Sequence, residues 1–455
     1  MILSLISYKC SCFSKGILTL KNIANYFEFD QLKTTFKREL VAGFTTFVSM
    51  AYILFVNPSI LGASGMNKGA VFTATALSAA FTCLVMGIYA KYPFASAPSL
   101  GVNAFFTYSV CIAMHIPWQT ALAGVFVASL IFLLLTVLKI RETIINSIPT
   151  DLKYAISSGI GLFIAFVGLK DSGLIVADKS TLVALGDIKG AVWVTLFGLL
   201  ITVVLMIMNV PGSIFIGMVA GAIFGMVMGY IPLPHQIISS IPSLKPTFGV
   251  AIHSLSQINS VQMWIVVFTF LLVTFFDTTG TLIGLAQQGG FMKDNKMPRA
   301  GRALMADSTG MLVGSVLGTS PVGAYVESSA GIAIGGRSGL TAVVTGLLFI
   351  VGMFFSPLLS VATSQVTAPA LIIVGVLMAE NMAKIHWNKL EVAIPAFLIL
   401  IGMPLTYSIS NGLALGFIAY PITMIAARKG KEVPPLMYVL FFVFIAFMWV
   451  LNFNL

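Results

Sequence analysis

The chain has 455 residues, of which 58% are hydrophobic and only 9% are charged, and its mean hydropathy is +1.00. A soluble protein usually carries about 25% charged residues, so this composition excludes a soluble globular domain and indicates a polytopic membrane protein. The formal net charge of +10 does not indicate nucleic-acid binding, because basic residues in a membrane protein mainly report its orientation.

Residues 1–40 are the most polar part of the chain and are expected to form a cytoplasmic N-terminal arm. The opening run MILSLIS is too short for a secretory signal peptide, and no small-residue cleavage pattern follows it closely. The four cysteines do not have the spacing of a zinc site. We therefore expect no metal and no organic cofactor.

Apolar runs long enough to cross a hydrocarbon core of about 30 Å recur along the rest of the chain. A first series of seven spans is expected at 41–61, 70–90, 94–113, 118–138, 152–172, 190–209 and 212–231. A second series of seven is expected at 262–288, 303–318, 321–335, 339–361, 367–383, 390–407 and 409–427. The run at 436–453 is either an extra span or a C-terminal appendage. The sequence thus predicts an all-α membrane protein with fourteen spans.

Basic residues are distributed unevenly between the two sides of this predicted membrane domain. With the N-terminus inside, only five of the 25 Lys and Arg residues fall outside: Lys68, Lys170, Lys179, Lys189 and Lys245. The other 20 fall on the inner side, as the positive-inside rule requires. The protein is therefore expected in the cell membrane, with its N-terminus in the cytoplasm.

Two predicted spans are interrupted by Pro, Gly and Ser: FASAPSLGVNAFF at 94–106 and GTSPVGAYVESSAG at 318–331. Each is the third span of its series, and an odd number of spans separates the two series, so the second copy would be inserted upside down. Paired interruptions of this kind are typical of transporters built from inverted repeats, and they mark the binding site. A broken helix exposes backbone groups that a substrate or a polar cavity must satisfy. The alternative is a pair of kinked helices that only pack closely.

Three acidic residues lie inside predicted spans: Asp277, Asp307 and Glu327. An ionised carboxylate at the centre of a bilayer costs roughly 2.5 to 3.5 kcal/mol, so such residues usually face a polar cavity on an ion or substrate path. The alternative for Asp277 and Glu327 is a protonated acid that bonds a neighbouring helix. Asp307 lies early in its span, where pairing with Arg302 or Arg337 near the cytoplasmic face would be a structural role.

Hydroxyl and aromatic side chains accompany these acids. Threonines that could bond a carboxylate, a substrate or the backbone surround Asp277: Thr274, Thr278, Thr279 and Thr281. Aromatic rings flank the same polar positions: Phe105, Phe106, Phe275, Phe276 and Tyr325. Grouped with Asn103 and two acids, the rings would offer a flat heterocycle faces to stack on and polar groups for its edge. No histidine lies within a span and no catalytic constellation is present, so carboxylates are the expected proton carriers and an enzyme is not expected.

Four long motifs carry a resemblance to a known family. They are AGFTTFVSMAYILFVNP at 42–58, SLGVNAFF at 99–106, FFDTTGTLIG at 275–284 and SPVGAYVESSAGIAIGGRSGLTA at 320–342. These motifs closely resemble the AzgA-like branch of the nucleobase:cation symporter-2 family, which are purine permeases of bacteria and fungi. The resemblance runs from about residue 30 to the end of the chain.

The resemblance implies proton-coupled uptake of adenine, guanine or hypoxanthine, and a fold like that of the uracil permeases. That fold would place one repeat at 41–231, its inverted copy at 262–427 and a C-terminal segment at 428–455. Spans 1–4 and 8–11 would form a core domain, and spans 5–7 and 12–14 a gate domain. Spans 3 and 10 would each begin with a short extended segment, and the substrate would lie between them against span 8. Related folds also suggest a homodimer through the gate domain.

The resemblance also implies roles for individual residues. Asp277 and Glu327 should be the acidic pair at the purine, with one of them linked to the proton. The expected substrate-binding residues are Asp277, Glu327, Asn103, Phe105, Tyr325 and Thr278. Asp307 matches a family acid whose role is structural or in coupling. Asp277 in place of the glutamate common in the wider family favours purines over uracil or ascorbate.

Two other functions are compatible with parts of the pattern. Anion exchangers share the expected architecture, but an anion site should use helix N-termini and positive charge, and two acids argue against it. A channel or a nucleobase sensor would have the same spans, but a channel would conduct and would not concentrate its substrate.

Overall fold

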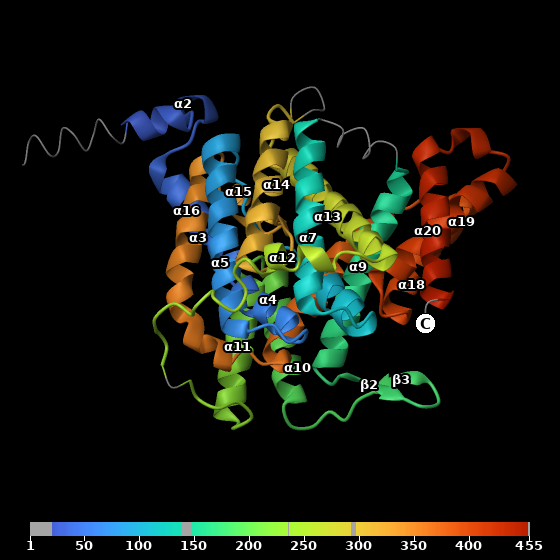
Figure 1. Ribbon diagram of the computed structural model, residues 1–455. Helices are drawn as coiled ribbons and strands as arrows, with labels where there is room; N and C mark the ends of the chain where they lie inside the picture. The colour runs from blue at the N-terminus through green and yellow to red at the C-terminus, as the bar shows by residue number, and fades with distance from the viewer. Residues whose placement is uncertain (1–20, 139–147, 235, 293–296, 454–455) are drawn as a thin grey trace, which may run out of the picture.

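The computed structural model describes residues 21–138, 148–234, 236–292 and 297–453. Within them the chain is mostly helical, and a helix lies at each of the predicted spans (Figure 1). The first half of the predicted N-terminal arm, residues 1–20, lies outside the described residues.

The first series follows the short helix α2 (Phe29–Leu32) of the arm. It contains α3 (Phe36–Met50), α4 (Ile53–Gly62), α5 (Lys68–Val85), η1 (Met86–Ala90), β1 (Ser96–Pro98), α6 (Leu100–Ala104), η2 (Phe105–Ala113), α7 (Trp118–Val137), α9 (Thr150–Asp171), α10 (Val192–Ile207) and α11 (Ser213–Val227). Between α9 and α10, strands β2 (Ile175–Asp178) and β3 (Leu182–Leu185) form an antiparallel hairpin. Figure 1 places α2 and this hairpin at opposite ends of the helical bundle.

The second series follows the short helix α12 (Val250–His253) and the 3-10 turn η3 (Leu255–Gln257). It contains α13 (Val261–Gln288), α14 (Ala300–Leu317), β4 (Val322–Ala324), α15 (Ser328–Ala333), α16 (Gly339–Gly352), η4 (Met353–Ser360), α17 (Ser364–Ala379), η5 (Glu380–Lys384), α18 (Leu390–Leu405) and α19 (Ile409–Ala426). The 3-10 turn η6 (Gly430–Glu432) then leads to α20 (Pro435–Phe453), which packs against α19.

Several helices begin where the sequence provides a capping side chain. Side-chain oxygens of Asn67, Ser260 and Ser408 accept hydrogen bonds from the backbone N–H groups at the starts of α5, α13 and α19. Beyond these caps the apolar runs must satisfy every backbone group internally, and a helix does so within one segment. This requirement explains why the predicted span positions agree closely with the observed helices.

Seven helices of the described chain are long and apolar enough to cross a membrane, and its other apolar helices have 10 to 17 residues. The structure therefore confirms an all-α, multi-pass membrane protein. The count of fourteen spans, and the question whether α20 crosses the membrane, stay predictions.

The two interrupted spans meet at the centre of the fold. Strand β1 pairs with β4 in antiparallel register, with Ala97 opposite Gly323, and every residue of both strands is buried. Each strand is followed by a short helix, α6 after β1 and α15 after β4. This arrangement confirms the predicted extended segments in spans 3 and 10. Their antiparallel pairing is the relation that an inverted repeat requires.

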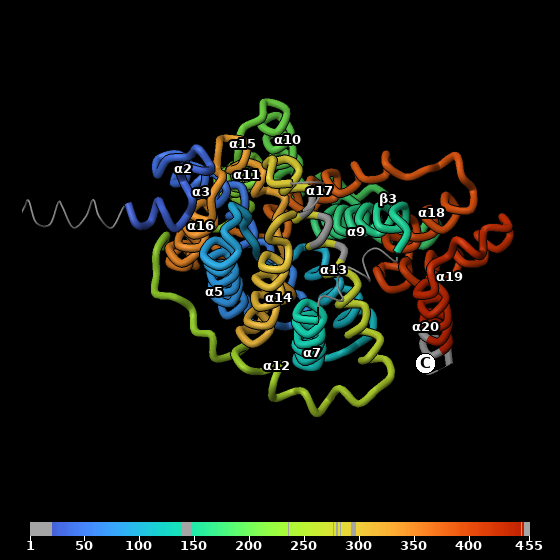
Figure 2. The backbone as a smooth tube through the Cα atoms, turned by 90° about the horizontal axis from the view of Figure 1, so that it is seen from above, coloured from blue at the N-terminus to red at the C-terminus, as the bar shows by residue number. Residues whose placement is uncertain are grey.

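Helices of the two series pack against each other in two groups. In one group α5 packs against α14 and α16, and α7 packs against α14. In the other α9 packs against α17 and α18, and α18 against α19. Figure 2 shows α9, α17 and α18 side by side, away from α5, α14 and α16. The division into a core and a gate domain is developed as a proposal below.

Candidate functional site

Two of the acids inside the spans lie beside the paired strands β1 and β4 and accept hydrogen bonds from hydroxyl groups. Asp277 belongs to α13, and Ser99, which follows β1, donates its hydroxyl to Asp277 Oδ2 at 2.5 Å. Glu327 precedes α15, and the Tyr52 hydroxyl donates to Glu327 Oε1 at 2.5 Å. Hydrogen bonds from hydroxyl to carboxylate are among the short and strong ones. Both residues are partly exposed in the structure.

Strand β4 brings the two acids to one place in the fold. A Cβ atom added at Gly323 would lie 3.8 Å from Asp277 Oδ2, so the Asp277 carboxylate lies against the β4 backbone. Glu327 follows the end of β4 at Ala324 by one short turn. The predicted acidic pair therefore flanks a single strand, although the two residues belong to different spans.

Tyr325 holds the two extended segments together. Its hydroxyl donates to the Pro98 carbonyl oxygen at 2.5 Å, and its backbone N–H donates to the Ala95 carbonyl at 3.0 Å. Ser99 completes the connection by donating its backbone N–H to the Pro321 carbonyl at 2.9 Å. Tyr325 thus lies at the predicted site, and its hydroxyl group bonds the backbone of the opposite segment.

Asn103 lies in a buried polar network that joins the two repeats. Its side-chain N–H group donates to Asn57 Oδ1 at 2.6 Å, and its Oδ1 accepts a hydrogen bond from the Ser320 hydroxyl. The Asn57 amide in turn donates to Thr75 at 2.7 Å and to Thr319 at 2.9 Å. The network connects α4, α5, α6 and the segment before β4. Asn103 thus bonds residues of both repeats, and its role as a substrate-binding residue stays a prediction.

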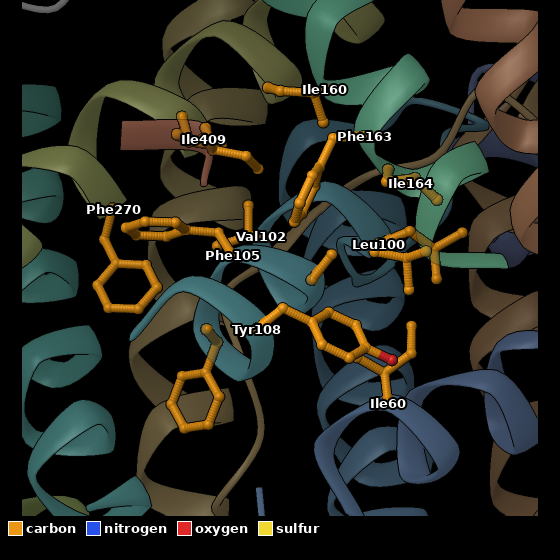
Figure 3. Close-up of a cluster of buried hydrophobic side chains, with 14 of the residues drawn as sticks. Ile60, Leu100, Val102, Phe105, Tyr108, Ile160, Phe163, Ile164, Phe270 and Ile409 are labelled. Carbon is orange, nitrogen blue, oxygen red and sulfur yellow. The ribbon is translucent and has the colours of Figure 1, made fainter. Parts of the chain in front are cut away.

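Phe105 and Thr278 make other contacts. The fully buried Phe105 ring packs edge-on against Phe270, with ring centroids 4.9 Å apart, inside a hydrophobic cluster (Figure 3). The Thr278 hydroxyl donates to the Thr274 carbonyl at 2.7 Å, within α13, and a Cβ at Gly323 would lie 2.6 Å from its methyl carbon. Phe105 thus packs in the hydrophobic core and Thr278 lies against β4, and their roles as substrate ligands stay predictions. The side chains of Phe276 and Thr279 lie outside the part of the chain that the structure describes.

Asp307 is fully buried in α14. The two arginines suggested as its partners have contacts of their own. The Arg302 guanidinium lies 5.7 Å from the Tyr89 ring centroid, and the Arg337 guanidinium donates to the Ile332 carbonyl at 2.6 Å. A structural or coupling role for Asp307 stays a prediction.

Sequence reasoning did not single out Tyr52, Ser99 or Asn57, which hydrogen-bond Glu327, Asp277 and Asn103 respectively. All three lie inside motifs that carry the family resemblance, and each is a polar residue in a buried apolar run. That combination was the available signal. The contacts themselves could not be predicted from the sequence, because they join elements that are distant along the chain.

Glu39, which falls in the predicted N-terminal arm, also has a specific position. It is fully buried in α3, and its carboxylate accepts hydrogen bonds from the backbone N–H groups of Arg337 and Ser338 and from the hydroxyls of Thr341 and Thr34. These groups lie mainly at the start of α16, where N–H groups have no partner within the helix. Glu39 therefore joins the start of the first span to the second repeat.

The sequence is similar to a family of permeases and to individual nucleobase permeases. A family model described as "Permease family" matches residues 37–415. The chain is 57% identical over 432 residues to the guanine/hypoxanthine permease PbuG of Bacillus subtilis (strain 168), covering 93% of this chain and 98% of that protein. It is 41% identical over 414 residues to the adenine permease AdeP of Escherichia coli (strain K12), covering 90% and 92%.

Among solved structures, the transmembrane domain of the cyanobacterial bicarbonate transporter BicA is similar with a TM-score of 0.61. The match covers 87% of this chain and 98% of that domain at 17% identity, and it confirms the fold alone. The family match accounts for most of the chain, and its members are permeases, so the prediction of a transporter rather than an enzyme is confirmed. The chain belongs to this permease family, in the purine permease branch of the nucleobase:cation symporter-2 proteins that its motifs indicated.

Proposed function

We propose that the protein takes up purine nucleobases across the cell membrane in symport with protons. The observation that carries this proposal is the pair of carboxylates, Asp277 and Glu327, beside the antiparallel strands β1 and β4. Each carboxylate accepts a hydrogen bond from a hydroxyl group. Two acids favour a ligand that presents N–H donors, and they disfavour an anion. Guanine, hypoxanthine and adenine, the bases named for the relatives, carry such donors on a flat ring.

In this proposal the base binds between the two interrupted spans, next to β1 and β4. Asp277 and Glu327 accept hydrogen bonds from its N–H edge, in place of the Ser99 and Tyr52 hydroxyls or beside them. One of the two acids takes up the coupled proton. Protonation removes a negative charge that is costly inside a membrane, so the loaded site can change its exposure from one side to the other.

The proposed transport movement is a rocking of a gate domain against a core domain. The core comprises spans 1–4 and 8–11, and the gate spans 5–7 and 12–14, with the N-terminus in the cytoplasm. The packing of α9 on α17 and α18, separate from that of α5 on α14 and α16, supports this division. We further propose that two copies associate through their gate domains, which the mass of the purified protein in detergent would report.

The test is uptake of radiolabelled hypoxanthine, guanine and adenine into a strain that lacks its own purine permeases. We expect Asp277→Asn and Glu327→Gln each to reduce initial uptake at least tenfold, and a protonophore to abolish accumulation by the unmodified protein. Matched controls are Asp187→Asn and Glu380→Gln, at exposed acids outside the proposed site, which should transport normally.

Each part of the proposal has its own contrary result. Near-normal uptake by both site variants would remove the acids from the mechanism. Accumulation that persists with a protonophore would exclude proton symport. Strong inhibition by bicarbonate or uracil, with none by unlabelled purines, would show that the fold carries a different cargo here.

A further inference from the structure

A second polar site lies at the end of the bundle opposite α2. A cavity of about 260 Å³ opens between the ends of α4 and η2 and the ends of α9 and α17, and neither Asp277 nor Glu327 lines it. Asp171, the last residue of α9, lines it and lies close to the β2–β3 hairpin. In the proposed orientation this cavity faces the outside of the cell.

The cavity holds a compact set of hydrogen-bonding groups. The Tyr108 hydroxyl of η2 donates to Asp171 Oδ2 at 2.5 Å. The Lys170 ammonium lies 4.7 Å from the Tyr407 ring centroid and donates to its hydroxyl oxygen at 3.2 Å. The Tyr108 and Tyr407 rings are themselves 5.7 Å apart in an edge-to-face arrangement. The Asp171 carboxylate, the Lys170 ammonium and the Tyr108 phenol therefore line this cavity, and Tyr407 lines the neighbouring cavity that shares Lys170.

Apolar side chains form the remaining wall. Ile60 of α4 and Leu371 of α17 line the same cavity, and Figure 3 shows the Tyr108 ring beside Ile60, away from the pair Phe105 and Phe270. A volume near 260 Å³ is at the small end of ligand cavities, which suits one small ring system. Apolar and aromatic walls with a few polar groups are the usual composition of such sites.

This chemistry selects a class of ligand. The Asp171 carboxylate can accept a hydrogen bond from an N–H donor, the Lys170 ammonium can donate to a ring nitrogen or carbonyl oxygen, and the Tyr108 ring offers an edge or a face. An anion would meet the Asp171 charge, and a non-polar molecule would make no hydrogen bond to the two charged groups. A flat heterocycle with donors and acceptors on its edge uses all of these groups.

The position of the cavity relates it to the acidic pair. Tyr108 lies two to three helical turns beyond Ser99 on the continuous segment of α6 and η2, whose start bonds Asp277. The cavity also opens at the boundary between the proposed core and gate domains. A neighbouring cavity of about 250 Å³ shares Lys170 and extends beneath the β2–β3 hairpin to Leu182.

We propose that this cavity is an outer subsite that binds a free nucleobase before it reaches Asp277 and Glu327. The inference rests on the proposed function and adds a second binding position to it. The Tyr108–Asp171 hydrogen bond joins a core span to a gate span. A base that enters the subsite replaces Tyr108 as the donor to Asp171, and so opens this contact as it moves inward.

The test is equilibrium binding of radiolabelled hypoxanthine to the purified full-length protein in lipid nanodiscs. We expect two bases per chain, one bound at least tenfold more weakly than the other. The double variant Asp277→Asn/Glu327→Gln should lose the tight site and keep the weak one. The double variant Tyr108→Phe/Asp171→Asn, which preserves side-chain volume, should lose the weak site and keep the tight one.

A matched control and a second measurement accompany this test. Asp187→Asn changes an acid whose side chain is 85% exposed on the same end of the molecule, and it should leave both sites intact. A photoreactive azidopurine should label a peptide that contains Tyr108 or Tyr407, and the label should be lost in Tyr108→Phe/Asp171→Asn.

The outcomes separate the two proposals. One class of site, lost in Asp277→Asn/Glu327→Gln, with no labelling near Tyr108 or Tyr407, would overturn the outer subsite and leave the proposed function standing. Weak binding that survives Tyr108→Phe/Asp171→Asn would overturn it as well. The absence of any purine binding by the unmodified protein would overturn the proposed function itself.

Discussion

A carboxylate inside a membrane protein needs hydrogen-bond donors where water is scarce, and here each acid of the site has one. Tyr52 donates to Glu327, and Ser99 donates to Asp277. A hydrogen bond to a charged group contributes about 1.5 to 3 kcal/mol. These two hydroxyls therefore hold the acids in position when no substrate is bound.

Removal of either donor should impair transport. Tyr52→Phe and Ser99→Ala are each expected to lower kcat/KM for hypoxanthine uptake about 10- to 100-fold, because 1.4 kcal/mol corresponds to a factor of ten. Initial rates over a range of hypoxanthine concentrations measure this effect. Tyr230→Phe, at a 44% exposed tyrosine, is the matched control. Normal efficiency in both donor variants would show that the acids need no such support.

Asn103 should behave differently from the acids, because it is fully buried and bonds Asn57 and Ser320. Asn103→Ala would leave two buried polar groups without a partner, at a cost of about 1 to 3 kcal/mol each. The expected result is a lower apparent Tm in detergent, with little change in KM for the protein that stays folded. A large rise in KM at an unchanged Tm would instead make Asn103 a direct ligand of the base.

At the scale of elements, the contact between β4 and α13 controls where Asp277 lies. A Cβ atom at Gly323 would come within 2.6 Å of the Thr278 methyl carbon, which is closer than packed atoms approach. Gly323→Ala should therefore push the strand and the helix apart and reduce uptake at least tenfold. Thr278→Ser removes that methyl group and retains the hydroxyl bonded to Thr274, so the double variant should recover part of the lost uptake. Equal uptake by the single and double variants would contradict this steric account.

Ion pairs connect another element, the N-terminal arm, to the helical bundle. Glu28 pairs with Lys91 at 2.9 Å and with Arg299 at 3.4 Å. The hydrogen bond from Lys91, together with the charges of Arg299 and Lys91, holds the pKa of Glu28 below its ordinary value of 4.5, against a smaller opposing effect of burial.

The lowered pKa of Glu28 gives a stability effect with a defined sign. The folded protein binds fewer protons at Glu28 than the unfolded chain, so the stabilisation is present above about pH 4.5 and is lost as the pH falls through the lower folded pKa. We expect Glu28→Gln to lower the free energy of unfolding at pH 7 by no more than about 1 kcal/mol, because the pair is partly exposed, and so to lower the apparent Tm slightly. In strong acid the substitution should have no effect. Thermal melts at both pH values, with and without added salt, would measure it. A difference that is equally large in acid would assign the effect to packing.

The elements of this protein were predictable to different degrees. Span positions followed from the sequence because lipid imposes helices on long apolar runs, and the interruptions of spans 3 and 10 followed from their Pro and Gly residues. The extended segments at those interruptions were implied by the family resemblance. The partners of the acids did not follow, because Tyr52 and Glu327 are 275 positions apart. The family resemblance implied Phe105 as a substrate-binding residue. Its contact with Phe270 did not follow from the sequence, because it joins two separate spans, and the role of Phe105 at the substrate stays a prediction.

At the scale of the whole molecule, the two series interlock through contacts that an inverted repeat makes symmetrical. Strand β1 of the first series lies against β4 of the second, and α9 of the first packs on α17 of the second. Each proposed domain therefore takes spans from both halves of the chain. A movement of one domain against the other would expose the acids alternately on the two sides, because they lie where both halves meet.

This movement predicts that a link across the outer boundary should stop transport. Ala63, which follows α4, and Ser364 of α17 line the outer cavity from the proposed core and gate sides, and both are exposed. In a background without other accessible cysteines, Ala63→Cys/Ser364→Cys joined by a bifunctional methanethiosulfonate reagent should lose nearly all hypoxanthine uptake. Dithiothreitol should restore it, and the same reagent should leave each single-cysteine variant active. Full uptake by the linked protein, with the link verified by mass spectrometry, would mean that α4 and α17 move together and that the boundary between the domains lies elsewhere.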